Sequence, residues 1–147
     1  SEDFTANRGR LPWPVEKGTI VDFFGTHEHP QLKGVMVQNN GIDIKTTGAA
    51  SVRAIFGGTV SGVIQIPGGQ NAVLIRHGEY VTVYSNLKSV SVRNGQKVST
   101  KQNIGQANTA GQCIGQGLRA IQICWGYSFA WHAAWQSALR HRLALFR

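Results

Sequence analysis

The sequence predicts an all-β fold of short antiparallel strands, and three observations support this prediction. Short runs rich in β-branched residues alternate with Gly, Pro and Asn up to about Ile104. The links between the best-defined runs have the length of β-hairpin loops. Hydrophobic residues make up 41% of the chain and charged residues only 15%, which favours a folded core over a disordered chain or a coiled coil. At 147 residues, one domain is expected.

The first predicted strands are short and interrupted. They are Thr19–Phe24, Val35–Val37 and Gly41–Ile44, each an apolar or alternating run bounded by Gly, Pro or Asn. The chain begins Ser-Glu-Asp-Phe, which lacks the basic and apolar blocks of a signal peptide, and no apolar run approaches the roughly 18 residues that a membrane span needs. We therefore expect no membrane span, and any export signal must lie outside this chain.

Two successive hairpins are predicted in the middle of the chain. The runs are Val52–Phe56, Thr59–Ile66, Asn71–His77 and Tyr80–Ser85, joined by Gly57-Gly58, Pro67–Gln70 and Gly78-Glu79. β-Branched residues dominate these runs, and the links suit hairpin turns. A further hairpin is expected where Asn94-Gly95 separates Ser91-Val92 from Lys97-Val98, because Asn-Gly is a strong hairpin-turn signal.

The composition changes abruptly after Gly105. Residues 106–147 hold three of the four Trp and both Cys, but no Asp, Glu, Lys or Pro. We therefore predict a β domain over residues 1–105 and a divergent basic tail over residues 106–147. Residues 130–146 can form an amphipathic helix, with Trp131 and Leu139 on its apolar side, which would pack on the sheet or lie on a membrane surface.

The excess of positive charge lies in the C-terminal half of the chain. The net charge is +8, all acidic residues lie at or before Glu79, and the basic residues that follow have no acidic counterpart. Such a half could contact an anionic wall polymer, nucleic acid or a membrane, and charge alone does not choose among them. Cys113 and Cys124 are too few for a disulfide framework and wrongly spaced for a metal-binding pair, so at most one bridge is expected.

Four motifs carry the most specific signal. They are Asn39–Ile44, Val52–Val60, Asn71–Gly78 and Tyr80–Leu87. In this order they resemble the LytM-type domain, the antiparallel β fold (a duplicated hybrid motif) of the lysostaphin-like zinc endopeptidases that cut peptidoglycan cross-bridges. The resemblance extends roughly from Leu11 to Gly105.

The resemblance implies a zinc site from which this chain departs. Active members have a His-x-Gly-x-Asp motif with two zinc ligands, a Tyr-x-His-Leu motif with a catalytic His, and a later His-x-His with a further catalytic His and the third ligand. Here the first motif ends in Asp43, which matches a ligand, but begins with Asn39 in place of His. The second has Asn86 in place of the catalytic His, and the third, expected between Leu118 and Trp125, is missing.

These changes predict a domain without zinc, cofactor or catalysis. Catalytic zinc needs three protein donors and an open position for water, and one carboxylate does not hold it. Asn86 cannot accept a proton near neutral pH, so it cannot replace a general base. The resemblance implies a degenerate groove that keeps its shape. Its floor is predicted to contain Asn39, Asp43, Tyr84 and Asn86, and its candidate rim residues are His29, Arg53 and His77.

The remaining histidines leave one rival zinc site. His27-Glu28-His29 is formally a His-x-His, although its place before Pro30 matches an N-terminal loop of the family. A zinc endopeptidase that uses His27, His29 and Asp43 is therefore an alternative. His77 matches a strand-end position and is expected to be a structural, hydrogen-bonded His. His132 and His141 lie in the divergent tail, and no spacing links them to Asp43.

Within the family, the pattern resembles the catalytically silent EnvC-type murein hydrolase activators. Those proteins are periplasmic and activate N-acetylmuramoyl-L-alanine amidases during cell division, which implies an amidase partner, a cell-envelope location and no nucleic-acid ligand. A passive module that holds peptidoglycan through basic residues is a third alternative; those residues are Lys88, Arg93, Lys97 and Lys101. Because the tail departs from the family, we also consider that it arises from a shifted reading frame or an unrelated graft.

Overall fold

The computed structural model describes residues 4–7, 10–22, 25–29, 31–39, 41–46, 50–65, 71–108 and 120–126. These residues form antiparallel strands and one short 3-10 helix, which confirms the predicted all-β class. The elements are η1 (Thr5–Asn7), β1 (Thr19–Asp22), β2 (Gly25–Glu28), β3 (Met36–Asn39), β4 (Gly41–Lys45), β5 (Ser51–Arg53), β6 (Gly58–Ile64), β7 (Asn71–His77), β8 (Tyr80–Val90), β9 (Lys97–Val98), β10 (Asn103–Ala107) and β11 (Ala120–Gly126). None of the described segments is a helix long and apolar enough to cross a membrane.

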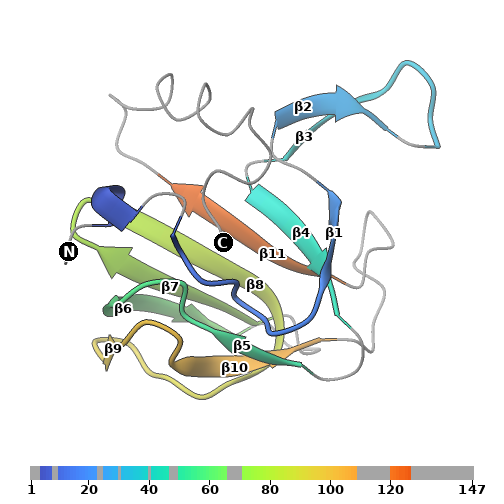
Figure 1. Ribbon diagram of the computed structural model, residues 1–147. Coiled ribbons are helices and arrows are strands. Elements are labelled where there is room, and N and C mark those ends of the chain that lie inside the picture. The colour runs from blue at the N-terminus through green and yellow to red at the C-terminus, as the bar shows by residue number, and fades with distance from the viewer. Residues whose placement is uncertain are drawn as a thin grey trace.

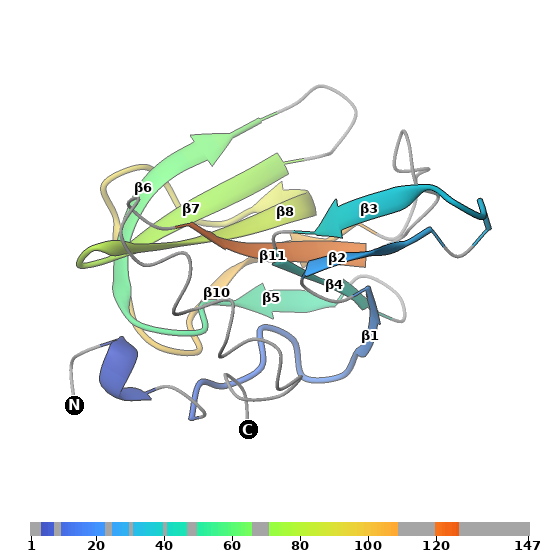
Figure 2. The ribbon, with the colours of Figure 1, turned by 90° about the horizontal axis from the view of Figure 1, so that it is seen from above.

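The main sheet has the strand order β1-β4-β11-β8-β7-β6-β9, and β10 joins it by pairing with both β5 and β8. Figure 1 shows β11 between β4 and β8, although it comes last of the three in the sequence. β2 and β3 form a separate antiparallel pair that projects from the rest of the protein, as both Figure 1 and Figure 2 show. We call residues 25–39, which contain this pair, the β2–β3 arm.

The predicted central hairpins are confirmed. β6 pairs with β7 and β7 pairs with β8, all antiparallel, whereas the predicted Pro67–Gln70 turn falls in a stretch that the structure does not describe. At the second turn His77 pairs with Tyr80, and Gly78 has a φ of 68°. Gly is the usual residue at the first central position of a type II′ hairpin turn, because it adopts a positive φ without strain.

The prediction of a hairpin at Asn94-Gly95 is wrong. In the fully described range 71–108, Ser91 and Val92 lie outside any strand, and β9 pairs with β6 instead. A tight turn does form, since Gln96 N donates to Arg93 O at 3.1 Å. The turn docks on β6 through Gly95 N and Val60 O at 2.7 Å. The local turn signal was therefore correct, but the edge of β6 supplied the pairing partner.

β8 changes partner along its length. Residues 81–85 pair with β11, whereas Leu87, Ser89 and Val90 pair with β10. Asn86 lies between the two ladders with a φ of 61°, which interrupts the regular strand. One long strand thus belongs to two ladders, and the predicted strand end at Ser85 marks the point of exchange rather than an end.

The core contains buried residues from the main sheet, from β5 and β10, and from the N-terminal segment. Figure 2 shows this segment running along the side of the sheet on which β5 lies. Leu11 and Val15 are each 1% exposed, and Ile44, Tyr84 and Leu87 are fully buried. Burying side chains of this size stabilises the fold by roughly 1.5–3 kcal/mol each.

Part of the predicted tail lies within the sheet. β10 crosses the predicted boundary after Gly105, and β11 occupies the place between β4 and β8. Cys113, His132, His141 and the helix predicted over residues 130–146 fall outside the described residues. The division at residues 105 and 106, and the origin of the tail, stay predictions.

Candidate functional site

The residues that match the family motifs lie on neighbouring strands of the main sheet. Asp43 is the middle residue of β4 and is 7% exposed. In the strand register it pairs with Gln122 of β11, and Gln122 pairs in turn with Ser85 of β8. On its other side Asp43 pairs with Asp22 of β1, so Asp43 lies in one row with Asp22 and with the residue that precedes Asn86.

Asn39 belongs to the strand before Asp43. It is the last residue of β3, and its backbone pairs with Gly25 at the base of the β2–β3 arm. Only Asn40 separates β3 from β4 in the sequence. Asn39 and Asp43, the first and last positions of the first motif, therefore lie on successive strands of two different sheets. Asn39 belongs to the arm and Asp43 to the main sheet.

Asn86 occupies the point where β8 changes partner. Its side chain is half-buried and its φ is 61°, in the left-handed region that most residues avoid. Its carbonyl oxygen accepts a hydrogen bond from Asn108 N at 3.1 Å. Asn and His are both enriched in this conformation, so either residue suits the backbone here.

Tyr84 is a structural member of the site. It is fully buried, and its hydroxyl accepts a hydrogen bond from Ile55 N at 3.0 Å. A second hydrogen bond of 3.1 Å joins this hydroxyl to Thr82 Oγ1. Burial raises the pKa of Tyr84 to about 12, so the phenol stays protonated at neutral pH. Tyr84 is therefore part of the core, and its place on the floor of a groove stays a prediction.

His77, the last residue of β7, belongs to the same hydrogen-bond network as Thr82 and Tyr84. Its Nε2 is hydrogen-bonded to Thr82 Oγ1 at 2.8 Å, and Gly57 O accepts from Nδ1 at 2.8 Å. The ring stacks on Phe4 at a centroid distance of 4.9 Å and is 6% exposed. Desolvation lowers the pKa of His77, which favours the neutral ring. The prediction of a structural, hydrogen-bonded His is confirmed, and its role on a rim stays a prediction.

The prediction of a loop at His27 is wrong, because His27 lies on β2 and pairs with Val37. His29 follows β2 and is half-buried. Its Nδ1 accepts hydrogen bonds from Gln31 N at 3.1 Å and Leu32 N at 3.2 Å. This nitrogen closes the turn of the β2–β3 arm, and the rim role predicted for His29 stays a prediction.

Arg53, the third candidate rim residue, ends β5. Its side chain is half-buried, and its Nε donates a hydrogen bond to Trp13 O at 2.8 Å. It lines a pocket between the N-terminal segment, β5 and the residues around β10. The structure thus places Arg53 beside other charged side chains, and its role on the groove rim also stays a prediction.

The donor set around Asp43 does not fit a catalytic zinc ion. Across the described parts of the chain, no three His, Cys, Asp or Glu side chains lie close enough together to hold a metal, and this search included His27, His29 and Asp43. The motif positions 39 and 86 hold Asn in the sequence, whereas catalytic zinc is held by imidazole, thiolate or carboxylate. We therefore derive no chemical step through a metal.

Two residues of this region escaped the sequence analysis. Gln122 lies opposite Asp43 only because β11 inserts between β4 and β8, and nothing local in the sequence reveals that register. Thr82 is fully buried and links His77 to Tyr84. Thr82 and Tyr84 are two residues apart on one strand, so their side chains lie on the same face. This spacing is the sequence signal that could have identified Thr82.

The comparison with known families agrees with this geometry. Residues 37–121, more than half of the chain, match the sequence profile of Peptidase family M23. The chain belongs to this family. The matched range begins in β3 and ends in β11, so it contains Asn39, Asp43, Tyr84 and Asn86. The LytM-type resemblance of the motifs is thereby confirmed.

Two curated relatives of this M23 domain are much longer proteins. The cell division protein DipM of Caulobacter vibrioides is 27% identical over 113 residues, which cover 76% of this chain and 17% of DipM. The peptidoglycan DD-endopeptidase ShyA of Vibrio cholerae is 35% identical over 91 residues, which cover 61% of this chain and 21% of ShyA. The matched part of the chain thus spans about a fifth of the length of these relatives.

Solved structures share the fold. A zinc-containing peptidase from Vibrio cholerae superimposes with a TM-score of 0.66 at 29% identity, covering 80% of this chain and 36% of the other. The complex of SpoIIIAH and SpoIIQ contains a chain that superimposes with a TM-score of 0.64 at 24% identity, covering 80% of this chain and 92% of the other. At that identity the second likeness concerns the fold alone.

Proposed function

We propose that this M23 domain is a non-catalytic regulator that binds and activates an N-acetylmuramoyl-L-alanine amidase in the periplasm or cell envelope. The observation that carries the proposal is the pair of amides, Asn39 and Asn86, where active relatives need imidazoles. An amide neither takes up a proton near neutral pH nor completes a zinc site. The surrounding sheet keeps the family's architecture, so the groove retains a shape without its chemistry.

The activation would be a shift between two states of the amidase. A regulator activates only if it binds the active form more tightly than the inactive one. To move the partner from 1% to 99% active, the affinities must differ by roughly 10⁴-fold. The row of Asp43, Gln122 and Ser85 across β4, β11 and β8 is the expected site of that difference, because it lies beside the motif positions that resemble the family's zinc site.

The exposed side chains of the β2–β3 arm favour a protein as the binding partner. Leu32, Val35 and Met36 are 55%, 46% and 61% exposed, and they are three of the four large hydrophobic side chains exposed in the described part of the chain. Exposed apolar side chains gathered on one projection are typical of protein interfaces. A wall glycan with its charged peptides would gain less from such a surface.

The arm is also held in one conformation. His29 Nδ1 accepts from two backbone amides of its turn, and Glu28 Oε1 accepts from Gly34 N at 2.6 Å. His29 N donates to Val35 O at 2.7 Å. Because the turn's polar groups are satisfied within the arm, its apolar residues are ordered before binding, which reduces the entropy that association loses.

The experiment is a pull-down from envelope extract, followed by an amidase assay on dye-labelled sacculi with and without the domain. We expect the domain to release no dye by itself and to stimulate the captured amidase. Met36→Glu should weaken this stimulation by about tenfold or more if Met36 lies in the interface. Ile64→Glu is the matched control, because Ile64 is 51% exposed but lies on β6, outside the arm.

A zinc endopeptidase is the second candidate, and the likeness to ShyA and to the zinc-containing peptidase favours it. Stoichiometric zinc in the purified protein, together with cleavage of cross-linked peptidoglycan, would establish this candidate and overturn the regulator. A third outcome, binding to sacculi without stimulation, would favour a passive module. That binding should fall steeply with salt if Lys88, Arg93, Lys97 and Lys101 carry it.

A further inference from the structure

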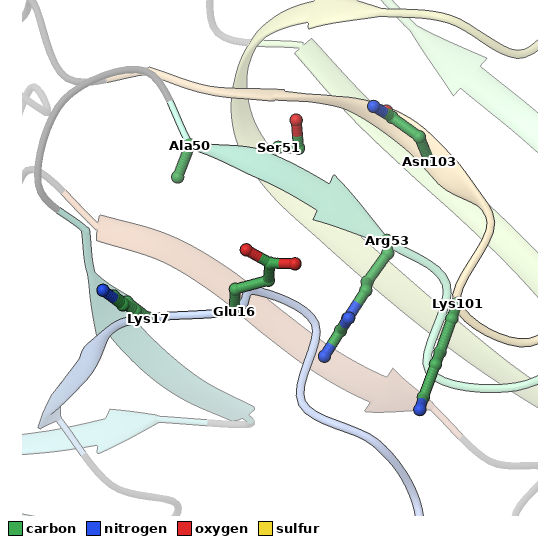
Figure 3. A pocket seen from close by; sticks show the side chains of 7 residues that line it. All are labelled: Glu16, Lys17, Ala50, Ser51, Arg53, Lys101 and Asn103. Carbon is green, nitrogen blue, oxygen red and sulfur yellow. The ribbon is translucent and has the colours of Figure 1, made fainter.

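A charged pocket is lined by none of the residues that form the row across β4, β11 and β8. It has a volume of about 450 Å³ and is lined by Glu16, Lys17, Ala50, Ser51, Arg53, Lys101 and Asn103. Figure 3 shows these side chains on three segments: the stretch before β1, strand β5, and the chain entering β10. Arg53 belongs to the motif Val52–Val60, whereas the other six lining residues lie outside the four motifs and the proposed groove floor.

The walls of the pocket are fixed by hydrogen bonds. Arg53 N donates to Pro14 O at 2.8 Å, and Arg53 Nε donates to Trp13 O at 2.8 Å. These two bonds hold the N-terminal segment against β5. Asn103 pairs directly with Arg53 in the strand register, which places both residues on one face of the β5–β10 pair. The pocket is therefore built before any ligand arrives.

Lys101 occupies a backbone position that suits glycine better. Its φ is 68°, and Gln102 N donates to Ser99 O at 3.1 Å, so Lys101 is the third residue of a β-turn. Gly or Asn is the usual residue at a positive φ in that place. Lys101 N donates to Ala54 O at 2.8 Å, which fixes the turn beside β5. An ammonium kept at an unfavourable backbone position, at the edge of a pocket, points to a role for its charge.

The charges of the pocket select a class of ligand. Lys17, Arg53 and Lys101 are cationic, and Figure 3 shows the Glu16 carboxylate between Lys17 and Arg53. An inorganic phosphate or a phosphate polymer would meet the repulsion of Glu16. A ligand that carries a carboxylate and an amine can instead place each charge beside an opposite one.

We propose that this pocket binds the free carboxylate of an amine-bearing peptide. Arg53 and Lys101 hold the carboxylate, and Glu16 receives the ammonium. Apart from Arg53, a candidate rim residue of the groove, the lining of this pocket lies outside the residues proposed for amidase binding. Variants of Lys101 and Glu16 therefore test the pocket alone, so a failure here leaves the proposed function intact, and a failure to stimulate an amidase leaves this site intact.

The test is a calorimetric or NMR titration of the whole chain with a synthetic tetrapeptide that has a free α-amine and a free α-carboxylate. The same peptide with an amidated C-terminus and inorganic phosphate are the comparison ligands. We expect the free acid to bind at least about fivefold more tightly than its amide, because the amide loses a charge-assisted pair. Phosphate should be the weaker competitor.

Lys101→Gly separates ligand binding from folding. Glycine relieves the positive φ, so this variant should melt at the same temperature as the parent or higher, while it binds the tetrapeptide about fivefold more weakly. Glu16→Gln should weaken the tetrapeptide but strengthen phosphate. Lys97→Gln is the matched control for net charge, because Lys97 is exposed on β9 and does not line the pocket.

Three results would overturn the proposal. The first is equal binding of the free acid and the amide. The second is the same loss of affinity in Lys97→Gln as in Lys101→Gly, which would show that only the net charge matters. The third is tighter binding of phosphate than of the tetrapeptide by the parent chain.

Discussion

Tyr84 and Asn86 lie two residues apart on β8, yet they belong to different kinds of site. Tyr84 is fully buried, and its hydroxyl is tied to Ile55 and Thr82. Asn86 is half-buried at the point where the strand exchanges β11 for β10. The first position is constrained by packing and the second by backbone conformation. A substitution at position 86 is therefore expected to disturb the sheet less than a substitution at position 84.

Histidine follows the same division. His77 is kept where both ring nitrogens have partners and aromatic rings cover the face of the imidazole. The two motif positions at which we propose that catalytic histidines are lost hold Asn39 and Asn86. Loss of the buried, hydrogen-bonded His77 is therefore expected to destabilise the fold, because its partners Gly57 O and Thr82 Oγ1 would lose their hydrogen bonds.

The largest effect that would sharpen this contrast is expected from Tyr84→Ala. Removing a fully buried aromatic side chain leaves a cavity and lowers the free energy of unfolding by about 3–5 kcal/mol. Urea unfolding followed by tryptophan fluorescence measures this change. A loss below about 1 kcal/mol would contradict the assignment of Tyr84 to the core.

The next effect is a loss of stability at alkaline pH. The pKa of Tyr84 rises from 10.0 in the unfolded chain to about 12 in the folded protein, so the folded state holds the phenol proton more tightly. This contribution is fully present below pH 10 and is lost as the pH rises towards 12, by roughly 2–3 kcal/mol in total.

Urea midpoints between neutral pH and pH 12 measure this loss. Tyr84→Phe is the control, because it keeps the ring and removes the titrating group. The difference between parent and variant should therefore shrink as the pH rises. A difference that stays constant across this range would show that the phenol does not titrate with folding.

A smaller effect is expected at Asn86. Asn86→Val forces a β-branched residue into the left-handed region and should lower the free energy of unfolding by about 1–2 kcal/mol. Asn86→His should change it by less than about 0.5 kcal/mol, because histidine tolerates this conformation. Thermal unfolding of the two variants and the parent measures these differences in the free energy of unfolding. Equal losses would show that the amide is needed by the fold and has not merely replaced a catalytic group.

The sequence allowed the strands themselves to be predicted better than the strands with which they pair. The strands β6, β7 and β8 were recognised because short turns join consecutive runs, and such turns fix the pairing by themselves. β11 could not be placed in this way, because its partners β4 and β8 come much earlier in the chain. The failed hairpin at Asn94-Gly95 has the same cause: the turn formed, but β6 supplied the pairing.

The same distinction between local and long-range order applies to the candidate site. Asp43 and Asn86 were found because each lies in a motif of consecutive residues. Gln122 was missed because only the sheet register brings it opposite Asp43. The pocket around Arg53 was missed because its charges come from three distant segments, and no spacing in the sequence joins Glu16 to Lys101.

The place of β11 also constrains how the protein is made. During synthesis β4 and β8 leave the ribosome long before the strand that separates them, so both must wait with an unpaired edge. Exposed edges invite pairing with other chains, and a contact between residues so far apart in sequence forms slowly. A nascent chain halted before residue 120 is therefore the form most prone to aggregate.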